Sequence, residues 1–128
     1  MTRALRGGLT LLAVTAVLGG LTSCARKTVY GEATPRIETT AGRDVVLELP
    51  SDPTTGEEWR MGALPDSRIM ALLSADYQAT PSSAPGGSGG RQRWTFRTVG
   101  PGTTMVRLDY GRPWAAPVKS TTFTIVVR

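Results

Sequence analysis

The segment RQRWTFRTVGPGTTMVRLDY, residues 91–110, decides the fold. Its first half alternates apolar and polar side chains and places Trp94 and Phe96 on one face. Its second half repeats the pattern with Val106 and Leu108, and a Gly-Pro-Gly sequence separates the two halves. Alternation with a period of two is typical of a half-buried β-strand, and glycine and proline mark turns. The segment therefore predicts two strands joined by a turn.

The same alternation recurs on both sides of this segment. Residues 43–49, 59–63 and 120–128 read as strands, and residues 68–78 fit either a strand or a helical turn followed by a strand. No helical period appears after residue 35. Six or seven short strands separated by polar turns predict an all-β fold, an immunoglobulin-like antiparallel β-sandwich of about seven strands. The chain of 128 residues suits one such domain.

The composition excludes several kinds of chemistry. The chain has no histidine and a single cysteine, so Ser-His-Asp and Cys-His catalytic groups, zinc sites of His and Cys, and an internal disulfide are impossible. Glu57 and Glu58 are adjacent, and on an extended chain they point to opposite faces, which does not suit an acid and base pair. We therefore expect no enzyme, no cofactor and no metal site.

The arginines do not indicate a nucleic-acid binder. The formal charge is +5, and no basic cluster is interleaved with exposed aromatic residues in the way that nucleic-acid recognition requires. Arginines 91, 93, 97 and 107 fall within the expected strands, where solvated strand faces account for them. We expect no nucleic-acid partner and a monomeric domain.

The N-terminal segment resembles the signal peptide of bacterial lipoproteins. Arg3 and Arg6 precede a ten-residue apolar run at 9–18, which is too short to cross a bilayer, and Leu21-Thr22-Ser23-Cys24 matches a lipobox. The resemblance implies export, removal of residues 1–23, and attachment of palmitate-type acyl chains to Cys24. Residues 24–35 would then be a lipidated tether at the membrane of the cell envelope, and residues 36–128 the domain. An ordinary secretory signal is the alternative.

Three stretches between the expected strands have unusual compositions. The first loop is SDPTTGEE (51–58), the second is APGGSGG (84–90), and the third is GRPWAAP (111–117). Each alone is explained as a turn, since proline and glycine favour turns. Trp114 is harder to explain, because a tryptophan beside a proline in a loop exposes apolar surface unless it packs or binds a partner. Trp59, at the start of a strand, is expected in the core.

The order and spacing of these loops resemble the chagasin family of cysteine-protease inhibitors. The family's first loop, Asn-Pro-Thr-Thr-Gly-(Tyr/Phe)-x-Trp, stands here as Asp52-Pro53-Thr54-Thr55-Gly56-Glu57-Glu58-Trp59. Its second-loop pattern, Gly-x-Gly-Gly, stands as Gly87-Ser88-Gly89-Gly90, and its third, Arg-Pro-Trp-Glu, as Arg112-Pro113-Trp114-Ala115. The resemblance covers roughly residues 36–128 and implies a sandwich whose three loops form a wedge.

The resemblance also implies a function. The wedge would enter the active-site cleft of a papain-like cysteine protease and block it reversibly without being cut. Thr54 would lie nearest the catalytic cysteine and histidine, and Trp114 would press on the primed side. Asp52, Glu57 and Ala115 depart from the family pattern, so two interpretations stay open: an inhibitor, or a non-inhibitory immunoglobulin-like lipoprotein that binds another envelope partner.

Overall fold

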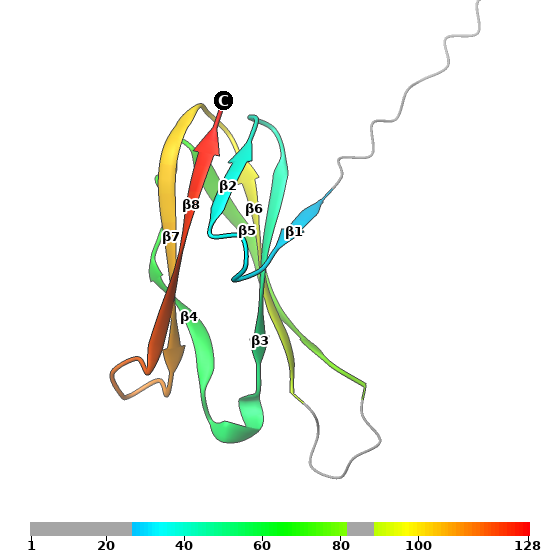
Figure 1. The fold of residues 1–128 in the computed structure, drawn as a ribbon, viewed down its shortest axis with the longest axis vertical. Coiled ribbons are helices and arrows are strands. Elements are labelled where there is room, and N and C mark those ends of the chain that lie inside the picture. The colour runs from blue at the N-terminus through cyan, green and yellow to red at the C-terminus, as the bar shows by residue number, and fades with distance from the viewer. Residues whose placement is uncertain (1–26, 82–88) are drawn as a thin grey trace, which may run out of the picture.

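The computed structural model describes residues 27–81 and 89–128, which form a β-sandwich (Figure 1). Its elements are β1 (Thr28–Tyr30), β2 (Arg36–Thr39), β3 (Asp44–Ser51), the 3-10 turn η1 (Pro53–Thr55), β4 (Glu58–Ala63), β5 (Met70–Ala79), β6 (Gly90–Thr98), β7 (Gly102–Gly111) and β8 (Lys119–Val127). No helix among the described residues is long and apolar enough to cross a membrane.

The strands form two four-stranded sheets, in the orders β1-β3-β6-β5 and β2-β8-β7-β4. Every pairing among β3 to β8 is antiparallel, as the sequence predicted. β1 and β2 differ, because each joins a sheet edge in parallel, to β3 and β8 respectively. The sequence missed these two strands, which are three and four residues long. β1 lies within residues 24–35, the segment that the sequence analysis assigned to a tether.

The segment at 91–110 forms β6 and β7, but these two strands belong to different sheets. The Gly-Pro-Gly turn therefore crosses from one sheet to the other. Trp94, Phe96, Val106 and Leu108 all point inward and are buried, as the alternation predicted.

One core fills the space between the two sheets. Its buried residues are Ile37, Val45, Leu47, Leu49, Trp59, Ile69, Met70, Trp94, Phe96, Val106, Leu108, Phe123, Ile125 and Val127. Trp59 is 2% exposed, which confirms its predicted place in the core. The outward arginines of β6 pair with carboxylates of β3: Arg91 and Arg93 with Glu48, and Arg97 with Asp44.

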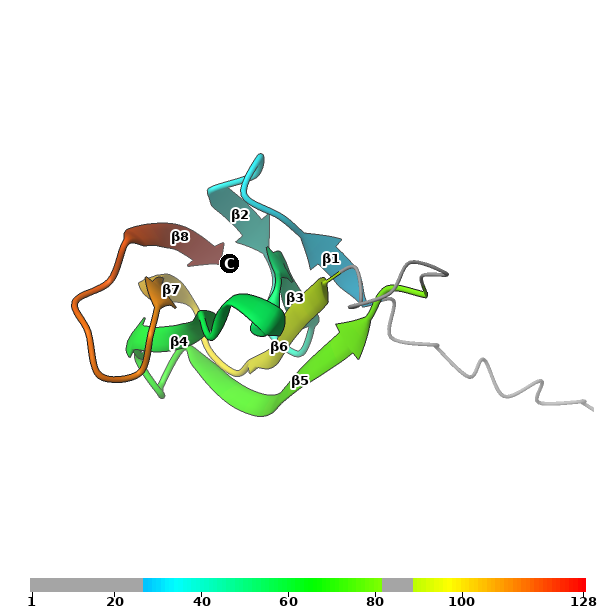
Figure 2. The same ribbon diagram turned by 90° about the horizontal axis from the view of Figure 1, so that it is seen from below.

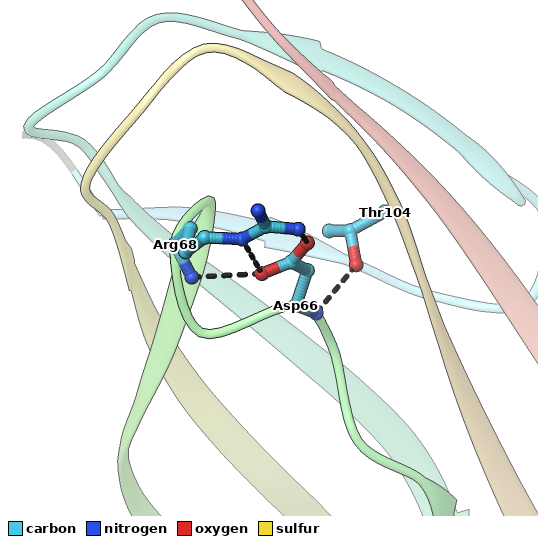
Figure 3. A network of polar contacts seen from close by, with 3 residues as sticks. All are labelled: Asp66, Arg68 and Thr104. Atoms are coloured by element: carbon cyan, nitrogen blue, oxygen red, sulfur yellow. Dashed lines mark hydrogen bonds and ion pairs between the residues drawn. The ribbon is translucent and has the colours of Figure 1, made fainter.

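The link from β4 to β5 is a tight polar turn (Figure 3). The carboxylate of Asp66 accepts hydrogen bonds from the backbone and the guanidinium of Arg68, and its backbone N–H donates to Thr104 Oγ1 on β7 over 2.8 Å. The bond from the Arg68 side chain lowers the pKa of Asp66 to about 2. The backbone N–H groups of Ile69 and Met70 donate to the Asp66 carbonyl, so a turn precedes β5, the second of the two predicted alternatives.

Candidate functional site

The three predicted loops leave and re-enter the sandwich at one end, which we call the loop end. The first loop connects β3 to β4, the second β5 to β6, and the third β7 to β8. Because β3, β5 and β7 all run toward this end, their connections start there, and Figure 2 looks onto this end with η1 and the link from β7 to β8 in view. Gly87 and Ser88 lie outside the described residues, whereas Gly89 and Gly90 are described.

The second loop meets the first at Gly89. A Cβ atom on Gly89 would lie 3.0 Å from the carbonyl oxygen of Ser51 and 3.5 Å from Cβ of Asp52, and Gly89 has a φ of +68°. A larger residue here would be strained and would press on the base of the first loop. Glycine at this position therefore lets the two loops approach each other closely.

The tip of the first loop is a 3-10 turn capped by Asp52. The Asp52 carboxylate accepts a hydrogen bond from the backbone N–H of Thr54 at 3.1 Å and another from the Thr54 hydroxyl at 2.6 Å. Pro53 occupies the first position of the turn, where its missing N–H costs nothing. The aspartate thus performs the N-capping for which Asn and Asp are about equally suited.

Thr55 and Gly56 close the same turn. The Thr55 hydroxyl donates to the Asp52 carbonyl over 2.8 Å and accepts from the Glu57 N–H over 3.2 Å. Gly56 adopts the left-handed conformation, with φ of 76°, and its N–H donates to the Pro53 carbonyl. Pro53, Thr54, Thr55 and Gly56 are all exposed. The tip is therefore a solvent-facing turn held by its own hydrogen bonds.

Trp59 joins the two ends of the first loop. Its indole N–H donates to the Pro50 carbonyl oxygen over 2.8 Å, so the residue that leaves the loop bonds to the strand that enters it. The buried ring also packs on Tyr110 of β7, with ring centroids 5.0 Å apart. A core residue therefore holds the two ends of the first loop together.

Gln92 joins the backbone of Trp59 to the opposite sheet. Its side-chain oxygen accepts from the Trp59 backbone N–H at 2.8 Å, and its side-chain nitrogen donates to the Trp59 carbonyl at 3.1 Å. Gln92 belongs to β6 and Trp59 to β4, so the pair of bonds crosses between the sheets. The first loop is thereby held in register with the strand that leaves the second loop.

Arg60 anchors the third loop. Its guanidinium donates to the carbonyl oxygens of Pro113 at 2.9 Å and Arg112 at 3.1 Å. Arg60 is half-buried and follows Trp59 in β4. The first loop's exit strand therefore fixes the backbone of the third loop, beside the tryptophan that the sequence singled out.

Trp114 projects from the third loop into solvent. Its side chain is 78% exposed, the highest value among the large apolar residues that are exposed in the described part of the chain. The other two tryptophans are buried. The sequence left open whether Trp114 packs or binds, and the structure shows that it does not pack within this domain.

Charged side chains make several contacts at the base of the third loop. The Lys119 ammonium lies 5.0 Å from the centroid of the Trp59 ring and 5.2 Å from that of Tyr110. Asp109 accepts from the Ser120 hydroxyl at 2.7 Å and from Arg107, and these bonds lower the pKa of the Asp109 carboxyl. These contacts stabilise both strands that carry the third loop.

The sequence of this chain is similar to those of known proteins. The sequence pattern of the family described as Chagasin family peptidase inhibitor I42 matches residues 38–127. The chain belongs to the chagasin family. It is 32% identical to chagasin of Trypanosoma cruzi over 90 residues, which cover 68% of this chain and 82% of that protein.

Solved structures of inhibitors share the fold of this chagasin-family chain. The cysteine protease inhibitor EhICP2 of Entamoeba histolytica superimposes with a TM-score of 0.69 at 21% identity, over 80% of this chain and 96% of that one. PbICP-C, solved in complex with falcipain-2, has a TM-score of 0.53 at 14% identity, over 86% of this chain and 94% of that one.

Sequence reasoning missed the residues that support the loops. Arg60 and Gln92 lie in strands and bond to backbone atoms, so no sequence motif predicts their role in supporting the loops. The position of Arg60 gives one signal, since a residue beside a buried tryptophan in a strand points away from the core. The identity of its partners depends on how the third loop folds back, which the sequence does not show.

Proposed function

We propose that this chain is a reversible inhibitor of papain-like cysteine proteases that inserts its loop end into the active-site cleft. The observation that carries the proposal is the juxtaposition of an exposed, self-bonded turn at 52–56 with the exposed Trp114 on one end of the sandwich. Membership of a family of peptidase inhibitors supports it.

Each loop has a separate part in the proposal. Thr54, at the exposed tip, would lie nearest the catalytic cysteine and histidine of the protease. Arg112, Pro113 and Trp114 would contact one wall of the cleft, and Gly89 and Gly90, with the rest of the second loop, the other wall. An aromatic side chain that is exposed in the free protein and buried in the complex is typical of a binding hot spot.

The hydrogen bonds within the loops favour tight binding. Asp52, Thr55 and Trp59 hold the first loop, and Arg60 holds the third, before any partner is present. A loop that is already ordered loses little conformational entropy on docking. Glu57 replaces the family's aromatic residue, yet its N–H still bonds to Thr55, so the turn closes without the aromatic ring.

Inhibition of purified proteases tests this function. Residues 25–128 contain the eight strands and the core that the structure describes, so this domain is the protein to purify. Titration against papain and several cathepsin-type enzymes should show reversible loss of activity with competitive kinetics. No inhibition of any of these enzymes at tens of micromolar would reject the proposal, and would favour a non-inhibitory envelope module instead.

We also propose that the chain is exported and anchored through acylated Cys24 to a membrane of the cell envelope, with the domain as a monomer. The lipobox-like sequence that ends at Cys24 supports the anchor. The full-length chain, expressed in a bacterium that processes lipoproteins, should incorporate a fatty-acid label and partition with membranes. A Cys24→Ser variant should lose the label. Equal labelling of the natural chain and the Cys24→Ser variant would contradict acylation at this residue.

A further inference from the structure

We propose that the end of the sandwich opposite the loops is a membrane-facing surface that meets anionic lipid and directs the loops away from the bilayer. We call this end the tether end and define it by the links at 40–43, 64–69 and 99–101. The inference rests on the proposed lipid anchor at Cys24, and it adds the orientation of the anchored domain.

The direction of β1 places the N-terminal entry at the tether end. β1 runs parallel to β3, with Thr28 beside Val45, and β3 runs from Asp44 to Ser51, where the first loop begins. Thr28 therefore lies near the start of β3, whereas the first loop follows the end of β3. The chain enters the domain at the end opposite the proposed wedge (Figure 1).

The tether is too short to turn the domain freely. Three residues separate Cys24 from Thr28, so a fully extended chain spans at most about 14 Å between them. Thr28 lies beside Val45, and the six residues from there to Ser51 carry the loop end roughly 20 Å beyond the point of entry. An acylated Cys24 therefore keeps the tether end near the bilayer.

Charge is distributed unevenly between the two ends. Six cationic side chains surround the tether end, against three carboxylates; the cations are Lys27, Arg36, Arg43, Arg68, Arg97 and Arg128, and the carboxylates are Glu38, Asp44 and Asp66. The loop end has four charges of each sign: Arg60, Arg91, Arg112 and Lys119 with Asp52, Glu57, Glu58 and Asp109. An anionic surface would attract the tether end more strongly.

Two cations at the tether end are available for a partner. In the part of the chain that the structure describes, the exposed side chains of Lys27 and Arg43 have no ion pair, whereas each of the three carboxylates has one. Basic residues close to an anionic membrane are attracted to its surface. Lys27 and Arg43 therefore supply the excess positive charge.

Exposed apolar side chains lie at the same end. Leu64 and Val99 belong to its links, and Met105 lies near the start of β7; their exposed fractions are 70%, 52% and 59%. Exposed apolar groups among basic residues fit the boundary between lipid headgroups and acyl chains. The bond from Asp66 to Thr104 holds the link at 64–69 on β7, so this surface is ordered (Figure 3).

Energy transfer from the domain to labelled lipid tests the orientation. Cys24 is the only cysteine, so once it is acylated a second cysteine can be labelled selectively. Ala41→Cys places a donor dye at the tether end and Ala115→Cys places it on the third loop, and both alanines are exposed. The lipidated full-length variants are reconstituted in vesicles of phosphatidylcholine and phosphatidylglycerol with an acceptor on the headgroups.

We expect clearly more transfer from residue 41 than from residue 115. Equal transfer from the two positions, or more from 115, would overturn the orientation, as would a chain that does not incorporate into vesicles. The contrast should shrink in phosphatidylcholine alone. A contrast that is unchanged there would overturn recognition of anionic lipid.

A charge reversal provides a matched control. Arg43→Glu should weaken association of the soluble residues 25–128 with anionic vesicles by about tenfold. Arg112→Glu makes the same change at an exposed arginine of the loop end and should leave vesicle association unchanged. Equal effects would contradict a specific tether-end surface. Papain inhibition by the soluble domain is measured separately, so loss of orientation with retained inhibition rejects this inference alone.

Discussion

The guanidinium of Arg60 lies 2.9 Å from the carbonyl oxygen of Pro113 and also reaches the carbonyl of Arg112. Through this contact the strand that leaves the first loop holds the third. The first and third loops are therefore linked by hydrogen bonds, although at least 52 residues separate Arg60 from its partners.

Replacing Arg60 should weaken inhibition by loosening the third loop. Arg60→Gln loses two hydrogen bonds from a charged donor, and such bonds contribute about 1.5–3 kcal/mol each. We expect the inhibition constant for papain to rise at least about tenfold. Arg107→Gln is the control, since Arg107 bonds to Asp109 on β7 and Gly62 on β4 and not to the backbone of the third loop. Equal losses in both variants would mean that Arg60 only stabilises the fold.

Trp114 should contribute to binding and not to folding. Its side chain is 78% exposed, so Trp114→Ala should leave the melting temperature unchanged. Loss of a hot-spot tryptophan costs about 2 kcal/mol or more, which raises the inhibition constant roughly 30-fold. Val118→Ala, an exposed apolar change in the same link, should have a small effect. Unchanged inhibition by Trp114→Ala would reject a role for the third loop.

Trp59 should stabilise the fold and order the first loop. Trp59→Phe keeps an aromatic ring but leaves the Pro50 carbonyl without its donor, which costs about 1–3 kcal/mol. Chemical denaturation measures this loss. Hydrogen exchange of amides in the first loop should also be faster in the variant. Unchanged exchange there would show that the indole bond does not hold the loop.

Asp52 should be replaceable by asparagine but not by alanine. Both Asp and Asn offer an oxygen to the Thr54 N–H, whereas alanine removes the cap at a cost of about 1 kcal/mol. Asp52→Asn should keep both stability and inhibition, and Asp52→Ala should weaken inhibition. If Asp52→Asn inhibited papain much more strongly than the natural chain, the negative charge itself would be opposing binding.

Asp66 should make stability depend on pH in acid. Its pKa falls from 3.8 to about 2 in the folded state because of its hydrogen bond with Arg68. A carboxyl whose pKa is lower in the folded state stabilises it above the unfolded pKa, and this contribution is lost as the pH falls toward the folded pKa. Between pH 4 and pH 2 the natural chain should therefore lose more stability than Asp66→Asn. Asp76→Asn, at an exposed position of β5, should match the natural chain.

The sequence predicted most of the sandwich because most strands alternate. Phe123 and Ile125, like Trp94 and Phe96, recur at a period of two and are all buried. Such burial is what the alternation encodes, so it was readable without a structure. β1 and β2 were missed because strands of three and four residues are too short for a period to be seen.

The sequence predicted only part of the candidate site. Proline and glycine mark the turn at 52–56, and a tryptophan beside a proline marks the third loop, because these residues have local conformational preferences. The bonds that fix the loops are not local: Gln92 reaches Trp59 from 33 residues away, and Arg60 reaches Pro113 from 53 away. Such contacts depend on the packing of both sheets, which alternation alone does not specify.

Binding to papain with an occupied cleft tests the central claim most directly. Papain is prepared in two forms, one with a small methylthio cap on its catalytic cysteine and one with a covalent peptidyl inhibitor that fills the cleft. If the loop end enters the cleft, residues 25–128 should bind the capped enzyme and should not bind the filled one. Equal binding to both forms, measured by calorimetry, would contradict insertion of the three loops into the active site.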